Sequence, residues 1–447
     1  MRGDPDILVV GGGPAGVAAA TAAAESGLSV ILSEMRASLG GAIHRQPAPG
    51  SKPIAPLPSL RGRWQSLRSA LTASGAEVAT RRSFIGIDST GAVMIDNRVT
   101  GQLEIYRPRA LILACGALEV VRPRPGWQLP GVVTAGGLQV MLKEGCVPKG
   151  RILIAGSGPL LLALATQLTA AGQPPVAVVE GGNPIARPLV ALGLLASPSI
   201  LPDVATLMQP MLMRRFPWWR STEVETIEQS GDGLAACLRL PNGRIRRIEI
   251  DRIALHDGLR SNDFGLPTDG ARDGLIVLRV GDVREVLGAH AAEEDGRRAG
   301  IEAAMRIKGQ APPAAVSAII VRERRLQAKL AAIFQPPDRT AAVLNCPDET
   351  VICRCENRTL GELKAQLSGR DTMSARELRL NGRFGMGACQ GRFCLPSTLS
   401  IMAALQPDTI KAEATEVAGQ RWPLRPVSLS ALADADVAPD RQSAMPS

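Results

Sequence analysis

Two stretches of the chain alternate short apolar runs with glycine-rich turns, in the order strand, turn, helix, strand. Residues 7–34 read ILVVGGGPAGVAAATAAAESGLSVILSE, and residues 151–180 read RILIAGSGPLLLALATQLTAAGQPPVAVVE. Continuous apolar runs of this length are typical of strands that are buried on both faces. Helices between such strands produce parallel sheets, so the pattern predicts an α/β protein with two tandem Rossmann-like dinucleotide-binding lobes.

Linker-like sequence divides the rest of the chain, whose 447 residues allow several domains. A Met- and Trp-rich segment at about 187–220 predicts a pair of inserted helices, serving either as a local core or as a subunit interface. The apolar pieces 234–240 and 246–254 are expected to complete the second sheet. We expect a first lobe over 1–125 and 265–310, a second lobe over 126–264, a linker and helix over 311–344, a third module over 345–428 and a flexible tail over 429–447.

The first glycine-rich turn carries a complete dinucleotide fingerprint. Gly11 permits a tight turn, Gly13 lets backbone N–H groups approach a pyrophosphate, and Gly16 allows close contact between helix and strand. Glu34 ends the next strand, where a carboxylate accepts hydrogen bonds from a ribose and repels a 2′-phosphate. The sequence around these residues favours FAD and adds Pro14, Ala15, Arg36, Gly40 and Gly41 to the predicted site.

Two further segments fit the same site. One is an apolar strand that ends in Ala114-Cys115-Gly116, and the other is Gly281-Asp282, whose carboxylate could accept hydrogen bonds from ribityl hydroxyls. Both resemble flavin-contacting motifs of glutathione-reductase-like flavoproteins. His44 follows the Gly40-Gly41 pair and is a candidate flavin neighbour, although a single histidine is more often structural.

The second lobe has Gly156 and Gly158 in its turn and Glu180 in the acidic position, but Leu161 replaces the third glycine. Two interpretations remain open: a working NADH site with looser helix packing, or a relic that has lost its nucleotide. A leucine would push the helix away from the strand where the pyrophosphate must lie, which favours the relic.

Four of the eight cysteines gather near the C-terminus, as Cys353-x-Cys355 and Cys389-x4-Cys394. Thiolates in two short loops are typical ligands of iron–sulfur clusters or zinc. Structural zinc usually uses C-x2-C knuckles, so the spacing favours a 2Fe-2S cluster over zinc or unligated thiols. The other cysteines form no C-x-x-C pair, which excludes the dithiol centre of disulfide reductases.

Composition narrows the class of function. The net charge is +9, but the basic residues are scattered, and aromatic residues make up only 3%. This argues against a nucleic-acid partner. No run is apolar enough for a transmembrane segment, and a strand begins almost at the N-terminus, so we expect a cytoplasmic protein without a secretory signal.

GGGPAG, Glu34-x-Arg36, GGAIHRQP, ACGALE, Pro130-Gly131-Val132 and GMGACQGRFC together resemble the alpha subunits of bacterial heteromeric amine and imino-acid dehydrogenases. The group includes the corresponding subunits of opine oxidase, D-hydroxyproline dehydrogenase and hydrogen cyanide synthase. The resemblance implies FAD in the first lobe and a bacterioferritin-associated-ferredoxin-like module whose 2Fe-2S cluster is held by Cys353, Cys355, Cys389 and Cys394. One departure stands out, because Gly281-Asp282 continues into Arg284-Glu285 instead of a run of small residues, so the pyrimidine end of the flavin is expected to be held differently.

The same resemblance implies an electron-transfer subunit that works beside a D-amino-acid-oxidase-like beta subunit, which oxidises an opine or imino acid. It also implies a small ferredoxin-like gamma subunit, an FMN at the alpha–beta contact and an acceptor such as a quinone. Two alternatives remain: an NADH-dependent reductase that passes electrons through the cluster to a ferredoxin-type or oxygenase partner, and a non-enzymatic assembly scaffold. No Ser/His/Asp or paired-carboxylate constellation stands out, so no residue is assigned to proton chemistry.

Overall fold

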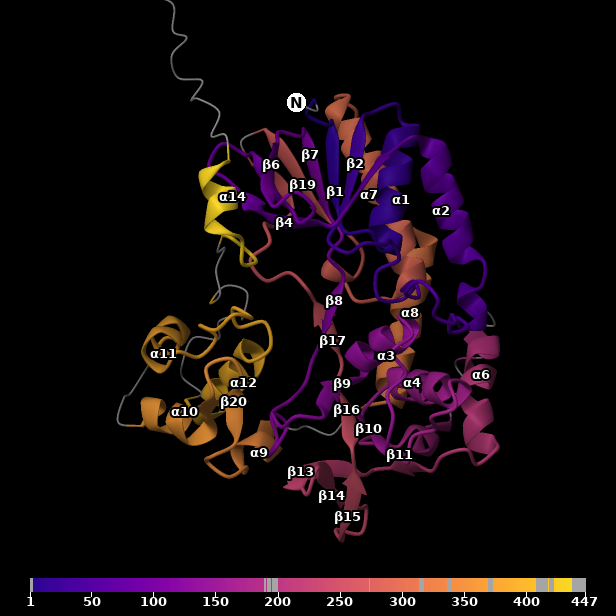
Figure 1. Ribbon diagram of the computed structural model, residues 1–447, viewed down its shortest axis with the longest axis vertical. Helices are drawn as coiled ribbons and strands as arrows, with labels where there is room; N and C mark the ends of the chain where they lie inside the picture. Colours follow the sequence, from indigo (N-terminus) through magenta and orange to yellow (C-terminus); the bar gives the residue numbers. More distant parts are fainter. Residues whose placement is uncertain are drawn as a thin grey trace, which may run out of the picture.

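Two α/β lobes and a smaller C-terminal module make up the computed structural model (Figure 1). The first lobe contains the N-terminal strands, the second lies beyond the short strands β8 and β17, and the module lies to one side of both. The structure describes residues 3–188, 200–272, 274–312, 317–335, 340–368, 373–406 and 422–435, together with the single positions 190, 194 and 417.

The first lobe is built on a six-stranded sheet in the order β18-β19-β7-β1-β2-β3. Its central strands are parallel and buried, as the apolar runs predict. The strands are β1 (Ile7–Val10), β2 (Val30–Glu34), β3 (Glu77–Thr80), β7 (Ala110–Leu113), β18 (Gly270–Arg272) and β19 (Leu275–Arg279).

Different layers cover the two faces of this sheet. One face packs on α1 (Pro14–Glu25), α2 (Arg63–Ser74) and α7 (Ala289–Ile307). The other packs on the antiparallel strands β4 (Arg82–Ile87), β5 (Val93–Asn97) and β6 (Gln102–Tyr106). Helices α1 and α7 touch backbone to backbone, because a Cβ on Gly296 would lie 2.0 Å from the Ala15 carbonyl oxygen.

The second lobe has a parallel sheet in the order β12-β11-β10-β16-β9. Its strands are β9 (Val132–Thr134), β10 (Ile152–Gly156), β11 (Ala177–Glu180), β12 (Trp218–Arg220) and β16 (Arg252–His256). Helices α3 (Ala135–Lys143) and α4 (Pro159–Ala170) cover one face. Of the pieces expected to complete this sheet, only β16 does so. β13 (Glu223–Ser230), β14 (Gly233–Arg239) and β15 (Ile245–Ile250) form a separate antiparallel sheet over its other face.

Short connections join the lobes and the module. The crossing strands β8 (Ala117–Glu119) and β17 (Leu259–Ser261) pair with each other between the lobes. Helix α8 (Ala318–Ile333) packs on α7 and reaches the second lobe (Figure 1). Within the predicted insertion at 187–220 the structure describes α6 (Leu201–Leu212) and β12; most of residues 189–199, where the other helix was expected, lie outside the described residues.

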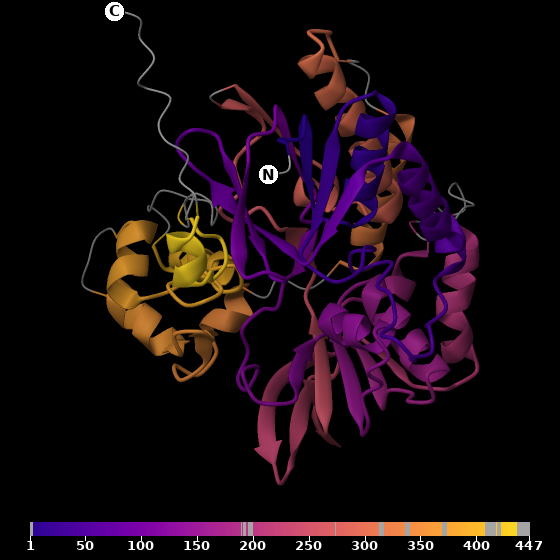
Figure 2. The ribbon, with the colours of Figure 1, turned by 45° about the horizontal axis from the view of Figure 1, so that its top comes forward.

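The C-terminal module has its own apolar core. It contains α9 (Thr340–Leu344), β20 (Val351–Cys353), β21 (Arg358–Thr359), α10 (Leu360–Leu367), α11 (Ala375–Gly382) and α12 (Leu395–Leu405). Trp127 anchors it, because its Nε1 donates to the Val351 carbonyl at 2.6 Å and the Arg354 guanidinium covers its ring. Figure 2 shows the module beside the first-lobe sheet.

The end of the chain departs from the predicted boundaries. Residues 422–424 belong with the first lobe, because Leu424 N–H donates to the Ile85 carbonyl and Trp422 packs edge-on against Phe84. The first residues of the expected flexible tail form the short helix α14 (Leu429–Ala433), which Ser428 caps. Leu424 and Ala431 are buried, and their apolar contacts order this segment, which composition alone did not reveal.

Candidate functional site

The glycine-rich turn after β1 leaves open space at one position only. A Cβ on Gly11 would lie 2.4 Å from the Ala114 carbonyl oxygen, and a Cβ on Gly16 would lie 1.8 Å from the Gly11 carbonyl oxygen. A Cβ on Gly13, in contrast, would meet only the Gly41 Cα within 4 Å, at 3.7 Å. Gly11 and Gly16 therefore serve packing, while Gly13 leaves room for a ligand backbone above the N-terminus of α1.

Glu34 lies at the carboxyl edge of the sheet, next to this turn. Its side chain is buried and accepts hydrogen bonds from the N–H groups of Gly12 at 2.7 Å and Arg36 at 2.8 Å. These bonds hold the carboxylate at the position where a dinucleotide presents its ribose. The Arg36 guanidinium points to Glu144, at 3.4 Å.

The Gly40–His44 loop closes over the same turn. Gly40 N–H donates to the Gly12 carbonyl at 2.8 Å, which places Gly41 against Gly13. His44 is buried and stacks on Trp64 with ring centroids 5.3 Å apart. Burial, together with the charges of Lys143 and other cations, lowers the pKa of His44 to about 4, so His44 is a neutral ring at physiological pH.

Lys143 lies beneath this loop and was not predicted from sequence. Its ammonium donates to the carbonyls of Ala42 and Ile43, both at 3.1 Å, and burial with the charge of Arg45 lowers its pKa to about 8. The Arg45 side chain is also buried, and its Nε has no hydrogen-bond partner in the described part of the chain. A terminal lysine of an amphipathic helix gives no sequence signal for such a position.

The predicted Gly281-Asp282 motif closes the site from the other side. Val280 N–H donates to the Leu113 carbonyl, which sets Gly281 beside the strand that ends in Ala114 and Gly116. One oxygen of Asp282, Oδ1, accepts from the N–H groups of Leu287 and Gly288, both at 3.1 Å. Burial raises the pKa of Asp282. The structure therefore brings the first-lobe residues together at one sheet edge: Gly11, Gly13, Pro14, Ala15, Gly16, Glu34, Arg36, Gly40, Gly41, His44, Ala114, Gly116, Gly281 and Asp282.

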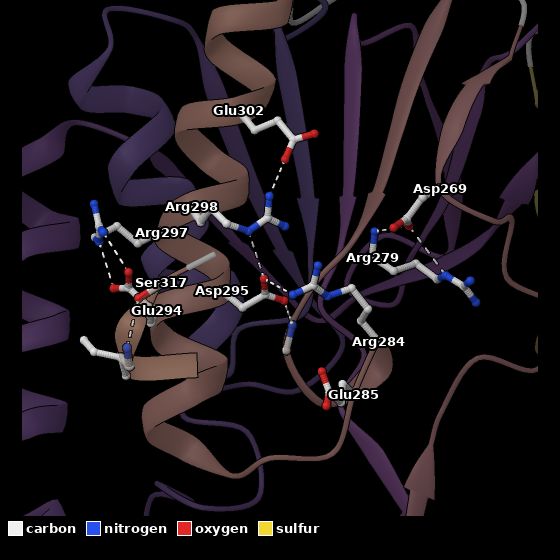
Figure 3. Close-up of polar contacts among 12 residues, drawn as sticks. Asp269, Arg279, Arg284, Glu285, Glu294, Asp295, Arg297, Arg298, Glu302 and Ser317 are labelled. Atoms are coloured by element: carbon white, nitrogen blue, oxygen red, sulfur yellow. Dashed lines mark hydrogen bonds and ion pairs between the residues drawn. The ribbon is translucent and has the colours of Figure 1, made fainter. Parts of the chain in front are cut away.

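The charged residues that depart from the family pattern point away from this edge. The Arg284 guanidinium reaches Asp295 on α7, whose other oxygen accepts from Gly281 N–H at 2.8 Å (Figure 3). Glu285 forms an ion pair with Arg324 of α8 at 2.7 Å. Their charges fasten this loop to α7 and α8.

The second-lobe turn is arranged differently. Glu180 is 1% exposed and accepts from the N–H groups of Gly158 and Gly182, both at 3.1 Å, and from the Ser157 hydroxyl. Ser157 Oγ also lies 2.7 Å from the carbonyl oxygen of Phe334, the residue that ends α8. The two N–H bonds to Glu180 repeat those to Glu34, so the second lobe differs in the added bond from Ser157 and in the Phe334 carbonyl that lies against Ser157.

Leu161 occupies the place of the missing glycine. It is fully buried in the core between α4 and the sheet, with Ile154 and Val178. The helix therefore packs through a side chain instead of through a backbone contact, as expected for a lobe that no longer holds a pyrophosphate.

The four C-terminal cysteines meet in the module. Cys353 ends β20, Cys394 precedes α12, and the Cys394 side chain lies against those of Cys353 and Cys389. Cys355 is exposed and donates to Cys389. The structure thus brings the two cysteine loops next to each other.

Backbone groups make this place suitable for negative charge. The N–H groups of Gly385 and Glu356 donate to Cys353, and those of Gly391 and Phe393 donate to Cys389. Hydrogen bonds, led by the one from Cys394, lower the pKa of Cys353 to about 6 and that of Cys389 to about 5. Among the described residues, no group of three or more His, Cys, Asp or Glu side chains is arranged around a metal position. Even so, four thiols with amide donors fit an anionic metal–sulfur group.

Comparison of the sequence and structure with known proteins identifies the family of this chain. Residues 5–276 match the family model of pyridine nucleotide-disulphide oxidoreductases, and this fold and site define a flavin oxidoreductase. The chain belongs to that family and, within it, to the group that contains the matching subunits of opine oxidase and of hydrogen cyanide synthase.

The relatives match over most of their length. The chain is 30% identical to the matching opine oxidase subunit of Rhizobium meliloti (strain 1021), covering 96% of this chain and 98% of the relative. It is 30% identical to hydrogen cyanide synthase subunit HcnB of Pseudomonas protegens, covering 87% and 90%. The crystal structure of L-proline dehydrogenase from P. horikoshii shares the fold, with a TM-score of 0.63 and 17% identity over 96% of this chain and 79% of that one.

Proposed function

We propose that this chain is the FAD- and 2Fe-2S-containing electron-transfer subunit of a heteromeric dehydrogenase that oxidises an opine, imino acid or amino acid. FAD would lie along Gly13, Gly41, Glu34 and Asp282. The cluster would be held by Cys353, Cys355, Cys389 and Cys394. When bound, the flavin accepts an electron pair and the cluster carries single electrons.

The observation that carries the proposal is the placement of the four thiols. They lie in two neighbouring loops whose side chains contact one another, and backbone N–H groups point to Cys353 and Cys389. The module that carries them is held to the rest of the chain by the Trp127–Val351 and Arg392–Phe264 hydrogen bonds. The Arg392 side chain, in the Cys389–Cys394 loop, acts electrostatically on the thiol of Cys115, which follows the first-lobe strand that ends at the flavin edge.

The substrate-oxidising chemistry is assigned to a partner. The opine oxidase and hydrogen cyanide synthase relatives are both called subunits. We therefore propose a D-amino-acid-oxidase-like beta subunit together with a ferredoxin-like gamma subunit, an FMN at the contact and a quinone-type acceptor. All eight cysteines are free thiols, in keeping with a reducing cytoplasmic location. No described helix is long and apolar enough to cross a membrane.

The NADH-dependent alternative is disfavoured by the end of α8, because the Phe334 carbonyl lies 2.7 Å from the Ser157 hydroxyl oxygen in the second-lobe turn. One experiment separates the two: the complex is kept free of air and the flavin absorbance is followed. Bleaching by an opine or imino acid in the presence of the partner, with none by NADH, supports the proposal. Rapid bleaching of this chain alone by NADH would refute it.

A further inference from the structure

Two half-buried arginines meet at the cysteine loop. Arg392 lies between Cys389 and Cys394, and Arg260 comes from β17. The Arg260 guanidinium donates to the Arg392 carbonyl and lies 4.2 Å from the centre of the Phe264 ring. Two cations from distant parts of the sequence are therefore held side by side.

The charge of Arg392 has no acidic partner among the described residues. Its guanidinium donates to Cys389 O and Gln390 Oε1, both at 3.2 Å, to Phe264 O at 3.4 Å and to Leu424 O at 3.5 Å. All four acceptors are neutral. In the same module the exposed Arg383 does have an acidic partner, because its guanidinium lies 2.8 Å from the Glu356 carboxylate.

Arg260 also forms no ion pair with an acidic side chain among the described residues. Asp257 and Asp263 each lie three residues away in sequence, but Asp257 pairs with Arg124, and Asp263 pairs with Arg279 at 3.8 Å. Neighbouring cations away from bulk water repel each other, and holding them together costs free energy unless an anion lies close by. Arg392 donates to the carbonyl of Cys389 at 3.2 Å, and Arg425 adds a further cation near it.

The segment that carries Arg260 also contacts the first lobe. Asn262, two residues after Arg260, donates from its side chain to the Cys115 carbonyl at 3.1 Å. Leu424, whose carbonyl accepts from Arg392, packs in the first-lobe core, and Phe264, the other acceptor, packs on Leu395 of the module. Arg260 and Arg392 therefore lie where the cysteine loop contacts the rest of the chain.

We propose that Arg260 and Arg392 are positioning residues that stabilise the negative charge gained when the thiol-bound centre is reduced. The inference rests on the proposed 2Fe-2S function. In this step one electron arrives, no bond forms or breaks, and no proton is required because the fixed guanidinium charges offset the added charge. The reduced flavin supplies the electron in the working complex, and dithionite supplies it in the test.

The test is a redox titration of protein purified without air, followed by visible absorbance and by the paramagnetic signal of the reduced centre. Arg392→Gln and Arg260→Gln should each make reduction roughly tenfold less favourable, which corresponds to a midpoint about 59 mV more negative for a one-electron couple. Arg392→Lys and Arg260→Lys, which keep the charge, should titrate close to the wild type. Arg376→Gln, which removes an exposed arginine of α11, is the matched control and should not shift the midpoint.

The outcomes separate this inference from the proposed function. Wild-type protein without iron and sulfide would overturn both. An intact cluster whose midpoint is the same in the Gln variants would overturn only the charge role, as would a Lys variant that shifts as far as its Gln counterpart. If Arg392→Gln fails to assemble the centre, Arg260→Gln still decides, because Arg260 lies outside the ligand loops.

Discussion

Ser157, in the glycine-rich turn of the second lobe, places its hydroxyl oxygen 2.7 Å from the carbonyl oxygen of Phe334 at the end of α8. Arg187 strengthens this contact by donating to the Ala332 carbonyl at 2.7 Å and to Gln335 Oε1 at 2.6 Å. A helix end brings carbonyl oxygens, which repel the anionic groups of a dinucleotide. The second lobe is therefore closed by its own chain.

Glu180→Gln should leave substrate-driven dye reduction unchanged, because Glu180 serves the fold and not a nucleotide. The N–H groups of Gly158 and Gly182 donate to different oxygens of Glu180, so Gln keeps an acceptor for only one of them and loses the charge-assisted bonds. The free energy of unfolding should fall by about 1–3 kcal/mol, measured by urea denaturation. A selective loss of NADH-dependent turnover in this variant would instead restore the second lobe as a working site.

Gly13→Trp should give a folded protein without flavin. The indole would fill the open space at Gly13, where a pyrophosphate would pass the turn. The measurement is flavin absorbance per chain, with circular dichroism and thermal unfolding as controls for folding. Normal FAD content in the folded variant would show that the flavin lies elsewhere.

His44 should make the protein sensitive to acid between pH 6.5 and about 4. Its pKa is lowered from 6.5 to about 4 by burial and nearby cations, so in this range the unfolded chain takes up a proton that the folded chain does not. Stability should therefore fall as the pH falls through this window, by about 3 kcal/mol in total, and should not change further from this group below pH 4.

The control for this prediction is His44→Phe, which keeps an aromatic ring against Trp64 but cannot take a proton. Urea unfolding of both proteins at a series of pH values gives the difference in slope. Equal slopes in the two proteins would contradict the assignment of a neutral, buried His44.

Gly86 and Trp422 should be energetically coupled. A Cβ on Gly86 would lie 2.2 Å from Cε3 of Trp422, so Gly86→Val should displace the end of the chain from the first lobe and expose it to limited proteolysis. In the Trp422→Ala background the same change should cost less, with a coupling of about 0.5–3 kcal/mol. Strictly additive effects of the two changes would mean that residues 422–435 are not docked there.

Much of the fold could be predicted from local pattern. The apolar runs at residues 7–10 and 152–156, each followed by a glycine turn, identify both parallel sheets because buried strands and close helix contacts require those residues. The first-lobe site and the meeting of the four cysteines follow from the same motifs. The antiparallel sheet β13–β15 was missed because its strands alternate and resemble additions to the main sheet.

The parts that could not be predicted depend on contacts across long sequence separations. Nothing in the sequence around Ser157 or Phe334 indicates that these two residues are in contact. Lys143 and Arg260 likewise reach their positions only because elements distant in sequence pack together. The docking of Trp422 on Gly86 is equally non-local. One clue was available, because a serine between Gly156 and Gly158 is suited to hold a neighbouring acceptor.

The central claim is that the four cysteines hold an electron-carrying cluster, and metal analysis of protein purified without air tests it most directly. We predict about two irons and two labile sulfides per chain, a visible absorption band and a paramagnetic signal after one-electron reduction. Cys394→Ser should lose the iron and keep FAD, whereas Cys237→Ser, which changes a cysteine of β14 outside the module, should keep both. Stoichiometric zinc without iron or sulfide in the wild type would contradict the account.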